Sequence, residues 1–133
     1  MESKAQELQK RTLKFAVSIV RLFRSLPNCA EVVGQQLLRS GTSVAANYRA
    51  ACKARSVADF VLKMGIVEEE SDETVFWLEF LVETGMVRSE RMPNLTDEAR
   101  QLTAIFAASR ITAKNNNRQS QIGNRKSKGI RND

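Results

Sequence analysis

The chain has 133 residues, enough for one domain with a single core and a short additional segment. Charged residues make up 27% of it and hydrophobic residues 42%, a composition that excludes a largely disordered or fibrous protein. It contains no histidine, so the side chain that most often serves as general base and metal ligand is absent.

Two features bear on cellular location. Cys29 and Cys52 are the only cysteines, too few for a disulfide scaffold. Residues 1–9 are polar and mixed in charge, unlike a signal peptide, and no apolar run approaches the length of a membrane span. We therefore expect a cytoplasmic protein with two free thiols and no membrane contact.

Residues 3–26 are predicted to form the first helix, because apolar residues recur at alternating steps of four and three. Ser3 and Gln6 have the spacing of a capping box at its start. Leu26 should end it, since the residue before a proline avoids the helical region. The predicted buried stripe is Leu8, Thr12, Phe15, Ile19, Leu22 and Leu26.

Residues 28–55 are predicted to form the second helix, with Asn28 as its cap. Small residues are frequent on its stripe, and Gly34 and Gly41 lie a heptad apart. The segment 40–43 has poor helix propensity, so a broken helix or a loop is an alternative there. We favour a continuous helix, because the periodicity persists and small residues let helices approach closely. The predicted stripe is Val33, Leu37, Ser40, Val44, Asn47, Ala51 and Ala54.

Two further helices are predicted over residues 56–84 and 94–114. Ser56 with Asp59 caps the first of them, and Gly85 stops it. Asn94 caps the second, whose first turn carries acidic Asp97. The predicted stripes are Phe60, Met64, Val67, Ser71, Thr74, Leu78 and Leu81, then Leu95, Ala99, Leu102, Phe106, Ser109 and Ala113.

Residues 115–133 differ sharply in composition, with Asn, Ser, Gln, Lys and Arg prevailing. Such a segment buries too little apolar surface to offset its ordering entropy, so we expect a basic tail that is disordered in isolation. Four long amphipathic helices with short connections predict an all-α, antiparallel up-down-up-down four-helix bundle over residues 1–114.

Charge is divided along the chain. Residues 1–55 carry a net charge of +7, residues 56–114 a net of −5 and the tail a net of +4. Basic side chains on the first helix and tail could bind phosphate backbones. A solvated helix face and an acidic protein partner are the alternative interpretations. The candidate nucleic-acid ligands are Lys10, Arg11, Lys14, Arg21, Arg24, Arg118, Arg125, Lys126 and Lys128.

The densest acidic run spans residues 68–73. Carboxylate metal sites in helical bundles also use histidine, so we expect no metal, no cofactor and no catalytic residue here. Part of the run should instead pair with Arg49, Lys53 or Arg55. Asn47 lies on the buried stripe and should hydrogen-bond Ser71, Thr74 or a backbone carbonyl across the core, with a ligand contact as the alternative.

The third helix is apolar on more than one face near residues 75–82, which a single bundle seam cannot cover. Trp77 could lie in the core, but large aromatic residues beside exposed apolar ones also anchor subunit contacts. We therefore predict a homo-oligomer whose interface contains Phe76, Trp77 and Phe80.

The stretch from Gln36 to Arg49, Lys53 to Ser56, Asp59, Phe60, Lys63 and the stretch from Ser71 to Leu81 together resemble a known bacterial family. It is the four-helix-bundle family of proteins encoded in intervening sequences of 23S rRNA genes, and the resemblance spans about residues 13–114. The signature positions are Ser40, Ser43, Asn47, Tyr48, Arg49, Arg55, Ser56, Phe60, Glu70, Asp72, Glu73 and Trp77. Relatives often carry Glu where this chain has Ala50.

This resemblance implies a homopentameric ring without established enzymatic activity. A distantly related accessory protein of diversity-generating retroelements uses a basic pentameric barrel to engage a reverse transcriptase and nucleic acid. Our leading hypothesis is therefore a non-enzymatic oligomer that binds RNA or a nucleoprotein, with no small-molecule substrate. A structural adaptor that docks a protein partner without nucleic acid is the alternative. Any enzyme would have to work with Glu, Asp or Lys alone.

Overall fold

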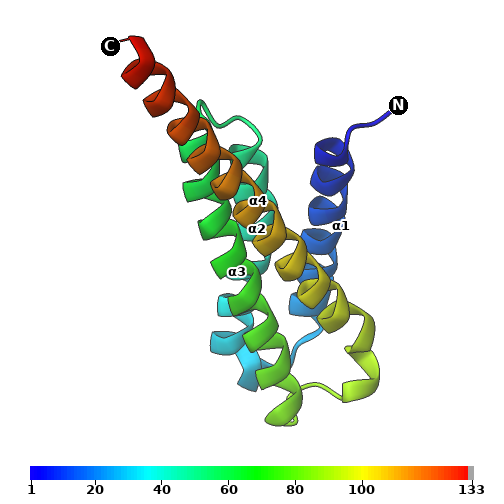
Figure 1. Ribbon diagram of the computed structural model, residues 1–133. Helices are drawn as coiled ribbons and strands as arrows, with labels where there is room; N and C mark the ends of the chain where they lie inside the picture. Colours follow the sequence, from blue (N-terminus) through cyan, green and yellow to red (C-terminus); the bar gives the residue numbers. More distant parts are fainter. Residues whose placement is uncertain (132–133) are drawn as a thin grey trace.

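The structure, a computed structural model, describes residues 1–131, and the side chains of all of these except residues 91, 93 and 125–131. Every regular element among them is helical, which confirms the all-α prediction (Figure 1). In chain order the elements are α1 (Lys4–Ser25), the 3-10 turn η1 (Asn28–Ala30), α2 (Glu31–Ala51), α3 (Val57–Glu83), the 3-10 turn η2 (Ser89–Arg91) and α4 (Pro93–Arg131).

Local signals set both ends of the first and third helices where the sequence predicted them. The Ser3 hydroxyl accepts a hydrogen bond from the amide of Gln6, whose side chain accepts one from the amide of Ser3, so the capping box is present. Ser56 caps α3 by accepting from the amide of Asp59 at 3.0 Å. Gly85 follows α3 with φ +74°, a left-handed conformation that glycine adopts without steric cost.

Two predictions for the second helix need correction. Asn28 does not cap it: the amide of Ala30 bonds the carbonyl of Pro27 at 2.9 Å, and this tight turn delays α2 until Glu31. The helix ends at Ala51 rather than at residue 55, because a tighter turn follows, in which the amides of Lys53 and Ala54 bond the carbonyls of Ala50 and Ala51, before the extended cap residue Ser56. Segment 40–43 is helical, as favoured.

Small residues determine how closely α1 and α2 pack. A β-carbon placed on Gly41 would lie 2.8 Å from Cγ1 of Ile19, and one on Gly34 would lie 2.8 Å from Cδ1 of Leu26. The glycines therefore allow large side chains of α1 to lie directly against the α2 backbone. The largest fully buried side chains include Ile19, Leu37, Met64, Leu78, Leu81, Leu102 and Phe106.

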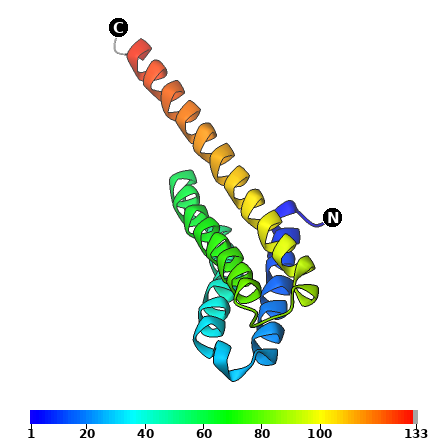
Figure 2. The same cartoon turned by 90° about the horizontal axis from the view of Figure 1, so that it is seen from below.

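Consecutive helices alternate in direction and pack as neighbours, α1 on α2, α2 on α3 and α3 on α4 (Figure 1). The first turns of α4 approach α1, where Arg11 pairs with Glu98. Figure 2 shows α4 then running obliquely away from α1 and past the N-terminal end of α3. The result is a packed four-helix bundle in which the first turns of α4 lie against α1.

The last helix is longer than predicted. It begins at Pro93, so Asn94 lies inside its first turn and does not cap it, and it continues to Arg131 instead of ending near Lys114. Extending an existing helix requires no new nucleus, and this segment contains no proline to interrupt it. Residues 115–124 are exposed apart from half-buried Asn117, so this part of α4 projects from the bundle with little support from other helices.

Candidate functional site

A row of cations lies along the outer face of α1. Lys10, Lys14 and Arg21 line a shallow depression on that face, and exposed Arg24 follows one turn later. We call these four residues the α1 basic stripe. Lys10 pairs with Glu2 at 2.7 Å. The other three have no ion-pair partner among the side chains that the structure describes.

Arg11 lies on a different face of α1. Its Nε donates to Oε2 of Glu98 at 2.8 Å, and its Nη2 donates to Oε1 of Glu98 at 2.5 Å and to Oε1 of Gln101 at 3.0 Å. Hydrogen bonding to Glu98 raises the pKa of Arg11. Arg11 therefore joins α1 to α4, and its charge is already compensated within the chain.

The candidate ligands in the tail lie on the projecting part of α4. Arg118 is exposed there, one turn after exposed Lys114. The backbones of Arg125, Lys126 and Lys128 continue the same helix, and their side chains lie outside those described. The tail cations and the α1 basic stripe therefore lie on different helices, α4 and α1.

Phe76, Trp77 and Phe80 form an aromatic cluster on α3. The ring of Phe76 lies 4.8 Å from that of Trp77 and 5.8 Å from that of Phe80, and the rings of Trp77 and Phe80 are also 5.8 Å apart. Phe76 is 52% exposed and Phe80 36% exposed, whereas Trp77 is half-buried. The chain does not enclose these rings by itself.

Several signature residues have structural roles. Buried Ser40 accepts a hydrogen bond from the hydroxyl of Thr74 at 3.0 Å, which joins α2 to α3. Tyr48 is buried with its ring 5.7 Å from that of Phe106 on α4, and burial raises its pKa. Ser56 caps α3, and the amide of Arg55 donates to Oδ2 of Asp59 at 3.3 Å.

The core hydrogen bond predicted for Asn47 is absent from the described part of the chain. Asn47 is half-buried, and Tyr48 takes the buried position of that helical turn instead. The hydroxyl of Ser71 lies 2.6 Å from that of Thr103 on α4, so its partner comes from a different helix. The prediction was wrong because steps of three and of four both continue a helical stripe.

The acidic run pairs with cations other than those predicted. Arg39 of α2 pairs with Glu70, at 3.1 Å, and with Glu73. Arg110 of α4 donates from Nε to Glu68 at 2.6 Å. Nε1 of Trp77 donates to Glu73 at 3.4 Å, which ties the aromatic cluster to this network. Of the remaining signature residues, Ser43 and Phe60 are half-buried, and Arg49, Arg55 and Asp72 are exposed.

These carboxylates offer no metal site. Among the residues that the structure describes, no group of three or more Asp, Glu or Cys side chains is placed to hold a metal ion. The hydroxyls of Ser40, Ser71 and Thr74 are buried and hydrogen-bonded within the core.

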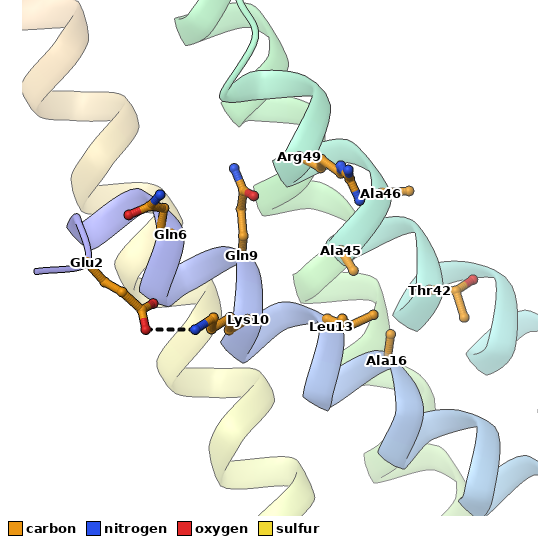
Figure 3. A pocket seen from close by; sticks show the side chains of 10 residues that line it. All are labelled: Glu2, Gln6, Gln9, Lys10, Leu13, Ala16, Thr42, Ala45, Ala46 and Arg49. Carbon is orange, nitrogen blue, oxygen red and sulfur yellow. Dashed lines mark hydrogen bonds and ion pairs between the residues drawn. The ribbon is translucent and has the colours of Figure 1, made fainter.

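The sequence reasoning missed a groove between α1 and α2 (Figure 3). We call it the α1/α2 groove; its volume is about 640 Å³. Its lining residues are Glu2, Gln6, Gln9, Lys10, Leu13, Ala16, Thr42, Ala45, Ala46 and Arg49. Leu13 could have indicated this groove from the sequence, because it is apolar and lies off the predicted buried stripe of the first helix. Its side chain is 61% exposed. The alanines opposite Leu13, Ala45 and Ala46, do not indicate a groove by themselves, because alanine is common on every face of a helix.

The part of the chain that is described contains no helix both long and apolar enough to span a membrane.

Comparison with known proteins identifies a protein family. Residues 4–108 match the family described as 23S rRNA-intervening sequence protein. No curated protein matches the chain.

A solved structure supports the same family. It is the crystal structure of a protein with unknown function from the S23 ribosomal protein family from Bacteroides thetaiotaomicron VPI-5482, which is 34% identical to this chain. The match covers 81% of this chain and 98% of that one, with a TM-score of 0.75. Because the family match spans most of the bundle and a solved relative shares its fold, the chain belongs to the 23S rRNA-intervening sequence protein family.

Proposed function

We propose that this chain is a non-enzymatic, homo-oligomeric, cytoplasmic protein that binds structured RNA, free or within a nucleoprotein. The α1 basic stripe and the projecting part of α4 would contact the RNA. The observation that carries the proposal is the lack of ion-pair partners for Lys14, Arg21 and Arg24 among the described side chains.

Ion pairs within the chain support the assignment of RNA contact to the α1 basic stripe rather than to other arginines. Arg11, Arg39, Arg100 and Arg110 each hold a carboxylate of the same chain, so they contribute little free positive charge. The stripe, in contrast, extends over fifteen residues of one helix, from Lys10 to Arg24, or about 21 Å at 1.5 Å per residue. A row of that length can contact several phosphates and release their condensed counterions.

The non-enzymatic part of the proposal rests on side-chain chemistry. The chain has no histidine to act as a base at neutral pH. The buried hydroxyls of Ser40 and Thr74 bond each other and neighbouring carbonyls, so they support helix packing rather than face a substrate.

Self-association is supported by the aromatic cluster. A ring that is 52% exposed beside another that is 36% exposed gives an apolar surface that a second copy could cover. The family resemblance favours a ring of five copies. A mass in solution equal to that of one chain, 14.9 kDa, at micromolar concentration would contradict this part of the proposal.

The RNA-binding part is tested by measuring affinity for a structured RNA at about 50 to 200 mM salt, by fluorescence anisotropy. The test variant combines Lys14→Ala, Arg21→Ala and Arg24→Ala. If these side chains contact phosphates, the slope of log K against log salt falls in magnitude by about 2 to 3, since each contact contributes roughly 0.7 to 0.9.

A matched control removes three exposed cations outside the stripe, Lys53, Arg55 and Arg88, by substitution with Ala. The control has the same change in net charge but keeps the α1 basic stripe intact. It should therefore lower the affinity for RNA less and preserve most of the salt slope. Binding that does not vary with salt, or equal losses in both variants, would refute the proposal. Co-purification of a protein that survives nuclease treatment, without RNA binding, would favour the adaptor function instead.

A further inference from the structure

The aromatic cluster and the α1/α2 groove both lack a partner within the described chain. We infer that the aromatic cluster of one copy docks into the α1/α2 groove of a second copy. The inference deepens the self-association in the proposed function by naming the two surfaces, and it does not depend on RNA binding.

The shape and chemistry of the groove suit aromatic side chains. Its α1 side presents Leu13 and Ala16, and its α2 side presents Thr42, Ala45 and Ala46 (Figure 3). Small side chains on α2 leave the space between the helices open, with a volume of about 640 Å³. An enclosed aromatic side chain buries about 150 to 250 Å². At 52% and 36% exposure, Phe76 and Phe80 can therefore bury roughly 130 to 220 Å² more, about a fifth of one side of a standard interface, so they would be the anchors of the contact rather than its whole area.

Charge complementarity identifies which surface fits the groove. Phe76 shares its face of α3 with Glu69 and Glu83, seven positions before and after it, and neither carboxylate has an ion-pair partner among the described side chains. The groove has two cations on its rim, Lys10 and Arg49.

The cation of Arg49 is the one available to an incoming copy. Lys10 already pairs with Glu2 of its own chain at 2.7 Å, as the dashed line in Figure 3 marks. Arg49 has no ion-pair partner among the side chains that are described. It can meet the acidic residues of the second copy and lie over an aromatic face.

A symmetric contact between two α3 faces is disfavoured by the same charges. No basic residue occurs in the sequence between Lys63 and Arg88, and Arg39 of α2 compensates only Glu70 and Glu73, so two such faces would bring Glu69 and Glu83 of both copies together around the rings. Like charges across an interface cost binding energy and suppress that pairing. The contact is therefore head-to-tail, with different surfaces on the two copies, and it builds a ring or an open chain.

Mixing two defective variants distinguishes a head-to-tail contact from a symmetric one. The first variant, Phe76→Glu with Phe80→Glu, loses the aromatic cluster. The second, Ala46→Glu, places a carboxylate in the groove. All three positions are exposed on helices, so both chains should keep their helical content by circular dichroism.

Each variant alone should be monomeric by native mass spectrometry or sedimentation, at concentrations where the wild type is oligomeric. A one-to-one mixture should give a dimer and nothing larger, because it restores one intact pair of surfaces. As a control, Leu62→Glu replaces an apolar residue that is 68% exposed near the other end of α3 and should leave assembly unchanged.

Three outcomes would overturn the inference: a monomeric wild type, either variant assembling as the wild type does, or a mixture that remains monomeric. A groove variant that assembles as the wild type does, while the aromatic variant is monomeric, points to the symmetric contact between two α3 faces. A monomeric wild type would refute the proposed self-association as well, whereas a variant that assembles as the wild type does would refute only the choice of these two surfaces.

Discussion

Gly41 and Gly65 are both helical glycines, but their surroundings predict opposite effects of substitution by alanine. A β-carbon on Gly41 would lie 2.8, 2.9 and 3.2 Å from Cγ1, Cγ2 and Cβ of Ile19, which is fully buried. A β-carbon on Gly65 would lie 3.8 Å from Cδ of Arg110, an ordinary contact.

Alanine in a helix interior is favoured over glycine by about 1 kcal/mol, because glycine loses more backbone entropy on folding. Gly65→Ala should therefore raise the free energy of unfolding by up to about 1 kcal/mol. At Gly41 the same gain is opposed by overpacking of a rigid, buried isoleucine, which costs about 1 to 3 kcal/mol. Gly41→Ala should therefore lower the free energy of unfolding by about 1 kcal/mol.

Urea denaturation followed by circular dichroism measures both changes, at one protein concentration because self-association alters apparent stability. The expected difference between the two variants is about 2 kcal/mol. Gly34→Ala should fall between them, since its nearest neighbour is Cδ1 at the flexible end of Leu26, at 2.8 Å. Equal stabilisation by Gly41→Ala and Gly65→Ala would refute the argument that α1 and α2 pack through Gly41.

Three other perturbations have defined outcomes. Thr74→Val removes a buried hydroxyl hydrogen bond between α2 and α3, so the free energy of unfolding should fall by about 1 to 3 kcal/mol in urea denaturation; no change would argue against that bond. Arg11→Met and Glu98→Gln should show a coupling energy of about 1 kcal/mol in a double-mutant cycle, smaller at high salt, and zero coupling would contradict the pair. The hydrogen bond from Lys63 lowers the pKa of Asp59, so its stabilisation is present above the unfolded pKa of about 3.9 and is lost as pH falls through the lower folded value. Stability measured from pH 6 to pH 2 should thus decline less in Asp59→Asn than in the wild type, and equal declines would exclude this contribution.

Helix ends were predictable where a short-range interaction sets them. The capping pairs at Ser3 and Ser56 and the left-handed glycine at Gly85 depend on residues three or four positions apart, so the sequence contains all the information. Asn28 failed as a cap because it is itself the first residue of the 3-10 turn that follows Pro27, and α2 begins only after that turn. The end of α4 was missed because composition does not reveal that a helix already formed can continue through a polar segment.

The partners of polar side chains were less predictable. Asn47 and Tyr48 both fit the periodicity of α2, and only the positions of α3 and α4 place the ring of Tyr48 against Phe106. The acidic run has several arginines within reach along the sequence, and the rotation of α2 about its axis selects Arg39. The α1/α2 groove likewise requires two helices, since its walls come from residues about thirty positions apart.

Four helices, the caps of α1 and α3 and most of the buried stripes could be predicted from the amino-acid sequence, because a helix is specified by contacts within a few residues and by a single period. It also indicated that α3 has more apolar surface than one seam can cover. Only the tertiary structure decided which cations form ion pairs within the chain. Arg11 pairs with Glu98, while Lys14, Arg21 and Arg24 are exposed and have no ion-pair partner among the described side chains. Ion pairs and grooves depend on the rotation and distance of packed helices, and these are set by the fit of the whole core rather than by any local segment.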